Sequence, residues 1–156
     1  MSQEIERKFL VNGDGWRSGP TEDGLPIRQG YLSTEKACTV RVRTVGDRAF
    51  ITVKGAPVGT VRAEYEYEIP VTDAHEMLDT LCGGPLIEKT RHELDVAGRQ
   101  WVVDVFAGDN DGLVVAEVEL EEEGQAVELP EWAAEEVTDD PRYLNVNLVK
   151  HPFNRW

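Results

Sequence analysis

The chain has 156 residues, of which 40% are hydrophobic and 29% charged, and its formal net charge is −14. The length predicts one domain, residues 1–156, and no apolar run approaches the ~20 residues of a membrane helix. The negative charge opposes binding to nucleic acid and to anionic membranes, and the two widely spaced cysteines fit a reducing cytoplasm. We therefore expect a cytoplasmic monomer or homodimer with neither of these partners. It would hold any anionic ligand with a local cluster of Lys and Arg.

Most of the chain is predicted to form β-strands, because β-prone segments alternate with turn signals such as Val45-Gly46-Asp47 and Ala97-Gly98-Arg99. The expected strands cover residues 2–11, 27–33, 38–45, 48–54, 60–69, 86–95, 99–106 and 112–121. Short connections make neighbouring strands antiparallel, and eight strands are enough to close a small barrel without exposed edges. The predicted fold class is thus mainly β (α+β), an eight-stranded antiparallel closed barrel or tunnel.

Few helices are expected. One begins near Thr72, with Asp73 as its N-cap and Glu76 at the capping-box position, and ends at Gly83-Gly84. Residues 12–26 contain Gly-Pro clusters and predict a loop with one turn around Trp16.

Two further helical segments are expected near the carboxyl terminus. Residues 131–138 follow Pro130, and a last helix follows Asp140-Pro141 and ends before Pro152. Such short helices can cover only part of a sheet.

Charged side chains alternate with apolar ones along the strands. Glu4, Glu6 and Lys8 share one face of the first strand, and Arg41 and Arg43 share one face of the third. The other charged faces carry Lys54, then Arg62 with Glu64, Glu66 and Glu68, then Lys89 and Arg91 with Ile87 beside them, then Asp104, and finally Glu117 and Glu119. Which of Glu64, Glu66 and Glu68 would reach a metal is left open by the sequence.

This pattern leaves three arrangements open: a charged outer face on an ordinary sheet, a barrel with an apolar lumen, and a tunnel with a charged lumen. In a charged tunnel, divalent cations would relieve the crowding of carboxylates, and Lys and Arg would bind phosphate oxygens. Carboxylates, divalent metal and basic groups together are the requirements of phosphoryl transfer to water.

The stretch Glu4-Ile5-Glu6-Arg7-Lys8 resembles the ExExK signature of the CYTH superfamily, the triphosphate tunnel metalloenzymes. ExExK alone is a weak pattern, but an ordered set of further segments resembles the same family over nearly the whole chain. These segments are Gln29-Gly30-Tyr31-Leu32, Val40-Arg41-Val42-Arg43, Thr52-Val53-Lys54-Gly55, Glu64-Tyr65-Glu66, Glu88-Lys89-Thr90-Arg91, Asp104, Ala116-Glu117-Val118-Glu119-Leu120, Glu136-Val137-Thr138 and Tyr143-Leu144-Asn145.

The resemblance implies a tunnel that binds a triphosphate together with Mg²⁺ or Mn²⁺. The implied phosphate-binding residues are Lys8, Arg41, Arg43, Lys54, Lys89 and Arg91. The implied metal ligands are Glu4, Glu6, Glu64, Glu66, Asp104, Glu117 and Glu119. The implied catalytic residues are Glu6, Lys8, Lys89, Asp104 and Tyr31, with Tyr31 orienting Lys8 or a phosphate.

Two structural expectations accompany these roles. The carboxyl-terminal helix, with Tyr143 and Asn145, should close one end of the tunnel, and Ile5 and Phe9 should pack outward under helices.

The expected activity is metal-dependent hydrolysis of inorganic tripolyphosphate to pyrophosphate and phosphate. A class IV-type adenylate cyclase and a thiamine or nucleoside triphosphatase are alternatives within the same superfamily. A non-catalytic polyphosphate-binding module is a further alternative, but such a module could dispense with the metal carboxylates.

Overall fold

The computed structural model describes residues 3–17, 24–59 and 61–156, with the backbone alone described at residues 3 and 4. The described strands are β1 (Gln3–Val11), β2 (Leu25–Glu35), β3 (Cys38–Val45), β4 (Arg48–Gly55), β5 (Val61–Ile69), β6 (Ile87–Val96), β7 (Arg99–Phe106), β8 (Val114–Glu119) and β9 (Ala133–Glu136). The described α-helices are α1 (Val71–Thr80) and α2 (Asn145–Lys150).

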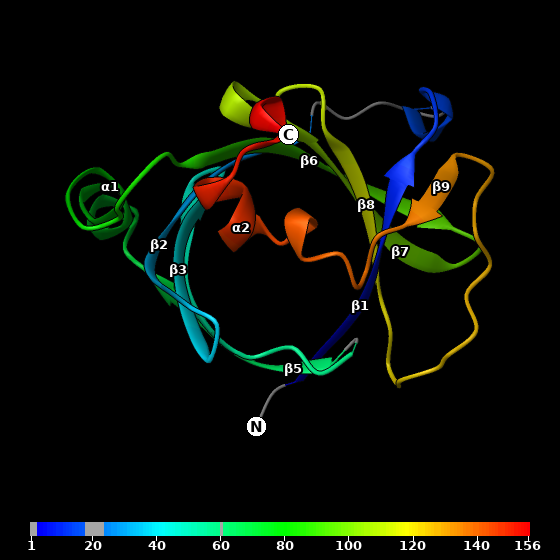
Figure 1. The fold of residues 1–156 in the computed structure, drawn as a ribbon, viewed down its shortest axis with the longest axis horizontal. Coiled ribbons are helices and arrows are strands. Elements are labelled where there is room, and N and C mark those ends of the chain that lie inside the picture. The colour runs from blue at the N-terminus through cyan, green and yellow to red at the C-terminus, as the bar shows by residue number, and fades with distance from the viewer. Residues whose placement is uncertain (1–2, 18–23, 60) are drawn as a thin grey trace.

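The first eight strands form the predicted closed antiparallel barrel, which Figure 1 shows as a ring. Their order is β5-β4-β3-β2-β6-β7-β8-β1, and β1 pairs with β5 as well as with β8. One long strand makes both pairings, because residues 3–5 of β1 lie beside β5 and residues 6–10 lie beside β8. The additional strand β9 pairs with the last residues of β1, with Phe9 opposite Glu136.

Closure of the barrel settles which face is inside, because the charged faces line the lumen and the apolar faces pack outward. Phe9 and Trp101 are buried in an outer cluster, with Ile5 packed against it, as expected for these positions of β1. Neither of the described α-helices contributes to this cluster, however. Trp16 lies on a short 3-10 turn (Gly15–Arg17), and Trp132 packs edge-on against Trp101 with ring centroids 5.5 Å apart. Large indole rings therefore replace the predicted helices here.

Helix α1 covers a different part of the barrel. Its buried residues Ala74 and Leu78 pack against Val42 of β3 and Ala49 of β4. Pro70 is its N-cap, without a side-chain capping bond, so the predicted cap at Asp73 is wrong. The fixed φ of proline suits a helix start, and the helix begins before Asp73 for that reason.

One end of the lumen is apolar and is closed by α2, as predicted for the carboxyl-terminal helix (Figure 1). Leu148 and Val149 of α2 share a buried cluster with Ile87, Phe106 and other residues of the barrel wall. The weak alternation of β6 now has a physical reason. Ile87 shares the inner face with Lys89 because the wall changes from charged to apolar where the helix packs.

The carboxyl-terminal third contains two corrections. Residues 131–138 include strand β9 in place of the predicted helix, because the edge of β1 offers backbone hydrogen-bonding partners such as the Lys8 carbonyl, which accepts from Val137 N. The single helix expected after Asp140 is divided into a 3-10 turn (Pro141–Tyr143) and α2, with Leu144 extended between them. Asp140 does cap the first piece by accepting from Arg142 N.

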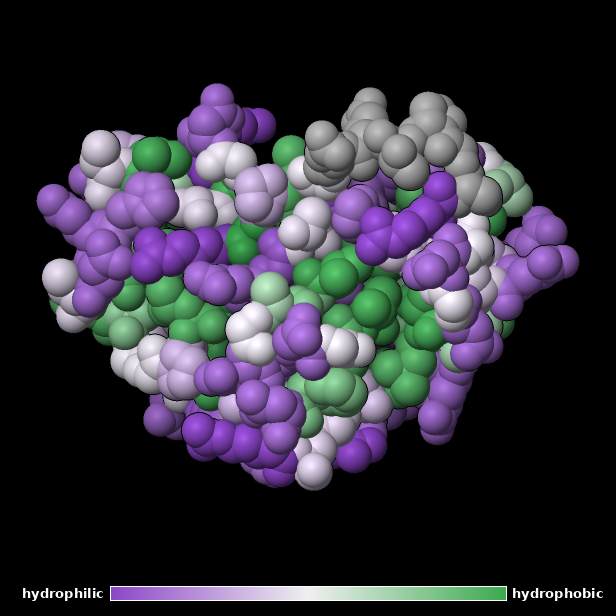
Figure 2. Space-filling model, turned by 90° about the horizontal axis from the view of Figure 1, so that it is seen from above, coloured by the Kyte–Doolittle hydropathy of each residue, from purple (hydrophilic) through white to green (hydrophobic). Residues whose placement is uncertain are grey.

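The Trp16 turn is confirmed, and residues 18–23 of the expected loop lie outside the described residues. Figure 2 shows mainly hydrophilic side chains on the face seen from above, with hydrophobic ones gathered toward its middle. None of the described helices is long and apolar enough to cross a membrane.

Candidate functional site

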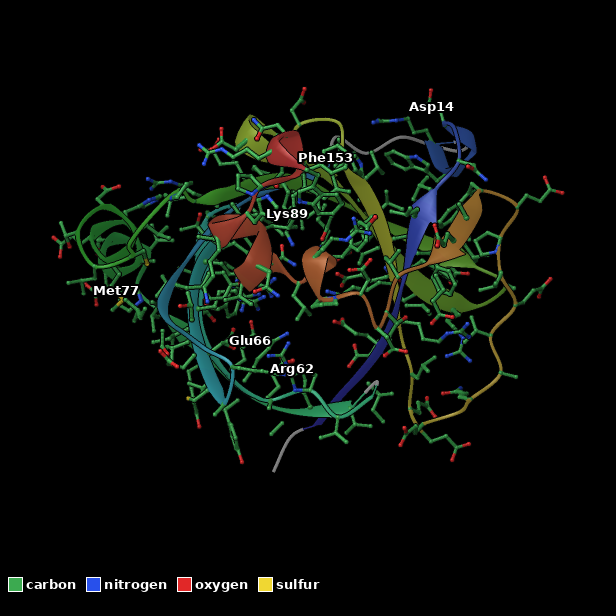
Figure 3. All side chains as sticks on the ribbon, in the orientation of Figure 1. Asp14, Arg62, Glu66, Met77, Lys89 and Phe153 are labelled. Atoms are coloured by element: carbon green, nitrogen blue, oxygen red, sulfur yellow. The ribbon has the colours of Figure 1, made fainter. Side chains whose placement is uncertain are left out.

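A cavity of about 230 Å³ lies in the charged part of the lumen. Its described wall contains seven cationic side chains, Lys8, Arg41, Arg43, Lys54, Arg62, Lys89 and Arg91. It also contains five carboxylates, Glu6, Glu64, Glu66, Glu117 and Glu119. Figure 3 labels Arg62, Glu66 and Lys89, which reach this space from β5 and β6. The chain as a whole carries a net charge of −14, so cations are concentrated in the lumen against the overall charge.

The structure brings the predicted phosphate-binding residues together, since all six line the cavity, and Tyr31 lines it with them. Five of the seven predicted metal-binding carboxylates also line it. The side chain of Glu4 lies outside the description, although its backbone is in β1 opposite Arg62. Asp104 is 2% exposed and lies behind the wall.

Three arginines of the wall have buried donors that lack a partner in the described part of the chain. The Nε atoms of Arg41, Arg43 and Arg62 are buried, and none has a hydrogen-bond partner among the described residues. Buried donors are nearly always satisfied in folded proteins, and a guanidinium can only donate. Three such donors around one cavity indicate an anionic ligand with several acceptor oxygens.

The crowding of positive charges around Arg43 also indicates an anionic ligand. Burial, together with the nearby charges of Arg41 and Arg91, lowers the pKa of Arg43 to about 10, although Glu66 accepts from its Nη2 at 3.2 Å. A group that is normally always protonated is therefore destabilised in its charged form. A bound polyanion would remove this cost.

Behind the cavity wall, one carboxylate holds two cations. Arg91 donates to both oxygens of Asp104, at 2.8 and 2.9 Å, and Lys89 Nζ lies 3.0 Å from Asp104 Oδ2. Burial opposes ionisation of Asp104, but Lys89 and Arg91 hold its pKa well below the ordinary value. Asp104 is thus an anion whose oxygens are already occupied by cations.

The contact with Asp104 stabilises the charged form of Lys89 less than that of Arg91, because the pKa of Lys89 is lowered and that of Arg91 is raised. Burial, together with the neighbouring charge of Arg91, lowers the pKa of Lys89 to about 8, although Asp104 favours the charged form. Its Nζ also donates to Asn145 Oδ1 at 3.2 Å, which connects it to the start of α2. Lys89 is therefore a buried cation that can lose its proton just above neutral pH.

The carboxylates of β1 and β8 face one another across the ladder. Glu6 is directly opposite Glu119, and Lys8 is directly opposite Glu117. Lys8 Nζ lies 3.8 Å from a carboxylate oxygen of both Glu6 and Glu117. Like charges directly opposite each other destabilise a sheet, so Glu6 and Glu119 are placed where a cation between them would be stabilising.

The chemistry of these donors fits a hard divalent cation, because Mg²⁺ and Mn²⁺ prefer carboxylate and water oxygens. Among the residues that the structure describes, no three His, Cys, Asp or Glu side chains form a compact group able to hold a metal by themselves. The carboxylates instead alternate with cations, so a metal here would share its site with an anionic ligand.

Arg62 is a charged residue of the described cavity wall for which the sequence predicts no role. Alternation along β5 places Arg62 on the same face as Glu64 and Glu66, and this alternation is the sequence signal that could have identified it as a lumen residue. Leu144, which belongs to the Tyr143-Leu144-Asn145 segment, also lines the cavity. Thr39 and Val146 line it too, and they carry no charge by which the sequence could have marked them.

Comparisons with known proteins agree with this geometry. The model of the CYTH domain matches residues 2–151. An inorganic triphosphatase of Acetivibrio thermocellus is 49% identical over 156 residues, covering 100% of this chain and 99% of that protein. An inorganic triphosphatase of Nitrosomonas europaea is 41% identical over 154 residues, covering 94% and 96%. A crystal structure of an inorganic triphosphatase has a TM-score of 0.64 and 39% identity, covering 96% of this chain and 95% of that one. With this match along nearly its whole length and a charged barrel lumen, the chain belongs to the CYTH domain family.

Proposed function

We propose that this protein is a metal-dependent triphosphatase that hydrolyses inorganic tripolyphosphate to pyrophosphate and phosphate in the barrel lumen. The observation that carries the proposal is the group of seven cations around one cavity, three of them with unpartnered buried Nε donors among the described residues. Family membership and the names of the two relatives support it.

The shape of the cavity favours a short inorganic chain. Its volume of about 230 Å³ is small, and Tyr31 is the one aromatic side chain in its described wall. Recognition of a nucleobase or a thiazole ring usually relies on stacking or on apolar contact, which this wall hardly offers. Tripolyphosphate is therefore a better fit than ATP or thiamine triphosphate.

We assign phosphate binding to Lys8, Arg41, Arg43, Lys54, Lys89 and Arg91. Lys8 and Lys89 are the least exposed of the lumen lysines, at 8% and 1% of their side chains, so their charges act in a poorly screened environment. Tyr31 lines the same cavity, and its hydroxyl accepts a hydrogen bond from Gln29 Nε2 at 3.4 Å. These groups would hold the phosphates in line and stabilise the charge that develops on the leaving phosphate.

Mg²⁺ or Mn²⁺ would be held by Glu6, Glu64, Glu66, Glu117 and Glu119, together with Glu4. When bound, the metal supplies neutralisation of phosphate charge and activation of water. We assign Asp104 a positioning role in place of metal binding, because its oxygens already accept from Arg91 and Lys89. The carboxylates of the wall also weigh against a binding module without catalysis, since a pure anion site would be stronger without them.

The test is phosphate release from tripolyphosphate, ATP and thiamine triphosphate, each with Mg²⁺, with Mn²⁺ and with a chelator. The proposal predicts fast release from tripolyphosphate that requires the metal. Absence of metal-dependent release from all three would refute it, and formation of cyclic AMP from ATP would favour the cyclase instead.

Glu117→Gln separates the metal role from the phosphate role. The carboxylate of Glu117 faces Lys8 at 3.8 Å and lines the cavity, so the change removes one negative charge with little change in shape. We expect metal-dependent kcat to fall about 10²-fold or more, as for loss of one preorganised electrostatic group. Binding of tripolyphosphate without metal should stay equal or become tighter. The exposed Glu122 provides the matched control, Glu122→Gln, which should keep full activity. Full activity of Glu117→Gln would contradict the assignment.

The lowered pKa of Lys89 predicts a pH dependence of binding. Lys89 is protonated below its pKa of about 8 and loses its charge as the pH rises through that value. The affinity for metal-free tripolyphosphate should therefore fall roughly tenfold per pH unit above about pH 8, and binding there should take up a proton. Calorimetry in buffers of different ionisation enthalpy measures both effects. In Lys89→Arg, whose guanidinium stays charged, this step should be absent. The same step in both proteins would assign it to another group.

A further inference from the structure

Arg62 occupies a special position in the barrel. It lies in β5 directly opposite Glu4 of β1, in the ladder that closes the ring, and its side chain lines the main cavity. It also lines an adjoining cavity of about 30 Å³ together with Lys8, Gly59 and Thr138. Arg62 and Lys8, with Glu6 and Leu144, therefore stand at the junction between the phosphate-sized space and a recess about as large as one water molecule.

The guanidinium of Arg62 has donors available for a ligand. Its Nε is buried without a hydrogen-bond partner among the described residues, and its Nη2 donates to Thr39 Oγ1 at 3.5 Å, the long limit for such a bond. Arg91, by contrast, is held by two hydrogen bonds of 2.8 and 2.9 Å to Asp104. Arg62 thus lines the cavity, and its Nε has no protein acceptor among the residues that the structure describes.

Arg62, Arg41 and Lys8 all lie near the phenol group of Tyr31. Burial raises the pKa of Tyr31, and the charges of Arg41, Lys8 and Arg62 oppose that rise. The three cations come from β3, β1 and β5, and all of them act on the one phenol group of β2. Such a group of cations from separate strands can surround one tetrahedral phosphate.

We propose that Arg62 is a seventh phosphate-binding residue, which binds, with Lys8, the terminal phosphate of the chain on the side of the small recess. This inference rests on the proposed function, since it concerns the same cavity and the same class of ligand. An end position has a consequence for specificity. A chain of three phosphates must use it, whereas pyrophosphate can bind to the remaining cations.

The experiment is calorimetric titration of the full-length protein with tripolyphosphate and with pyrophosphate, in the presence of a chelator. Loss of one charge-assisted contact should weaken tripolyphosphate binding by Arg62→Ala about 10–100-fold. Pyrophosphate binding should weaken less. Arg62→Lys, which keeps the charge without the planar fork, should lie between Arg62→Ala and the natural protein. Arg48→Ala removes an exposed arginine of β4 that pairs with Glu68 outside the cavity, and it should bind as the natural protein does.

Thermal unfolding of each variant checks that the barrel is intact. Unchanged tripolyphosphate affinity in Arg62→Ala and Arg62→Lys would overturn the inference, as would equal weakening for tripolyphosphate and pyrophosphate. If Arg62→Ala fails to fold, Arg62→Lys is the deciding variant. Unchanged tripolyphosphate affinity in Arg62→Lys would overturn the inference, and reduced affinity for tripolyphosphate would support it. Tight binding by the natural protein without hydrolysis after metal is added would refute the proposed function alone.

Discussion

Replacement of Lys89 by alanine is expected to lower kcat/KM for tripolyphosphate about 10²–10³-fold. The Lys89 side chain is 1% exposed and lies 3.0 Å from Asp104, and it lines the cavity between β6 and α2. Its removal deprives the bound substrate of a poorly screened positive charge. It also leaves Arg91 as the remaining one of the two cations that contact Asp104. Truncation of one member of a buried charge pair typically costs about 2–5 kcal/mol, which corresponds to a change of this size.

Two variants make the Lys89 measurement specific. Lys36 is exposed in the turn between β2 and β3, so Lys36→Ala removes a lysine charge without touching the lumen and should retain full activity. Lys89→Arg keeps the charge and should recover part of the loss. Activity of Lys89→Ala within a fewfold of the natural protein would show that this ammonium does not contact the reacting phosphates.

Asp104→Ala should produce the largest loss of stability, about 3–5 kcal/mol in the free energy of unfolding. The carboxylate is 2% exposed and accepts from Arg91 while it contacts Lys89, so its loss leaves two cations in a wall already rich in positive charge. Chemical denaturation measures the difference. Metal-free tripolyphosphate should restore part of it, because a polyanion in the lumen replaces the missing negative charge.

The pH dependence of the Asp104 effect has a definite sign. The pKa of Asp104 is held well below that of an unfolded aspartate, so its contribution to stability is fully present above about pH 4. The contribution is lost as the pH falls through the lowered pKa, and the two proteins should then converge. Asp111→Ala, in an exposed turn, is the control and should differ little from the natural protein at any pH. A loss below about 1 kcal/mol in Asp104→Ala would contradict a structural role for this ion group.

Much of the barrel was predictable because strands carry their information in a period of two. Turn signals located the strand ends to within a few residues, and alternation placed Glu6 with Lys8 and Arg41 with Arg43 on common faces. Alternation alone does not distinguish inside from outside, since either face of a closed sheet can be the lumen. The resemblance to the CYTH family resolved that choice, and the cavity confirms the placement of these cations.

The features that the sequence did not predict have local physical causes. Residues 131–138 have helix-compatible composition, but pairing of β9 with the free edge of β1 outweighs that weak preference. Asp104 alternates onto the inner face like a metal ligand, and its depth behind Lys89 depends on side-chain packing that periodicity does not encode. Arg62 was on the correct face but was not assigned a role, because it stands among glutamates on an acidic strand.

The most direct test of the central claim is a ³¹P NMR time course of tripolyphosphate with the natural protein, before and after addition of Mg²⁺. We predict no change while a chelator is present. After the metal is added, the triphosphate signals should disappear while pyrophosphate and phosphate appear in equal amounts, and Lys89→Ala should abolish most of this rate. Persistence of tripolyphosphate with Mg²⁺ and with Mn²⁺ would contradict hydrolysis in the lumen.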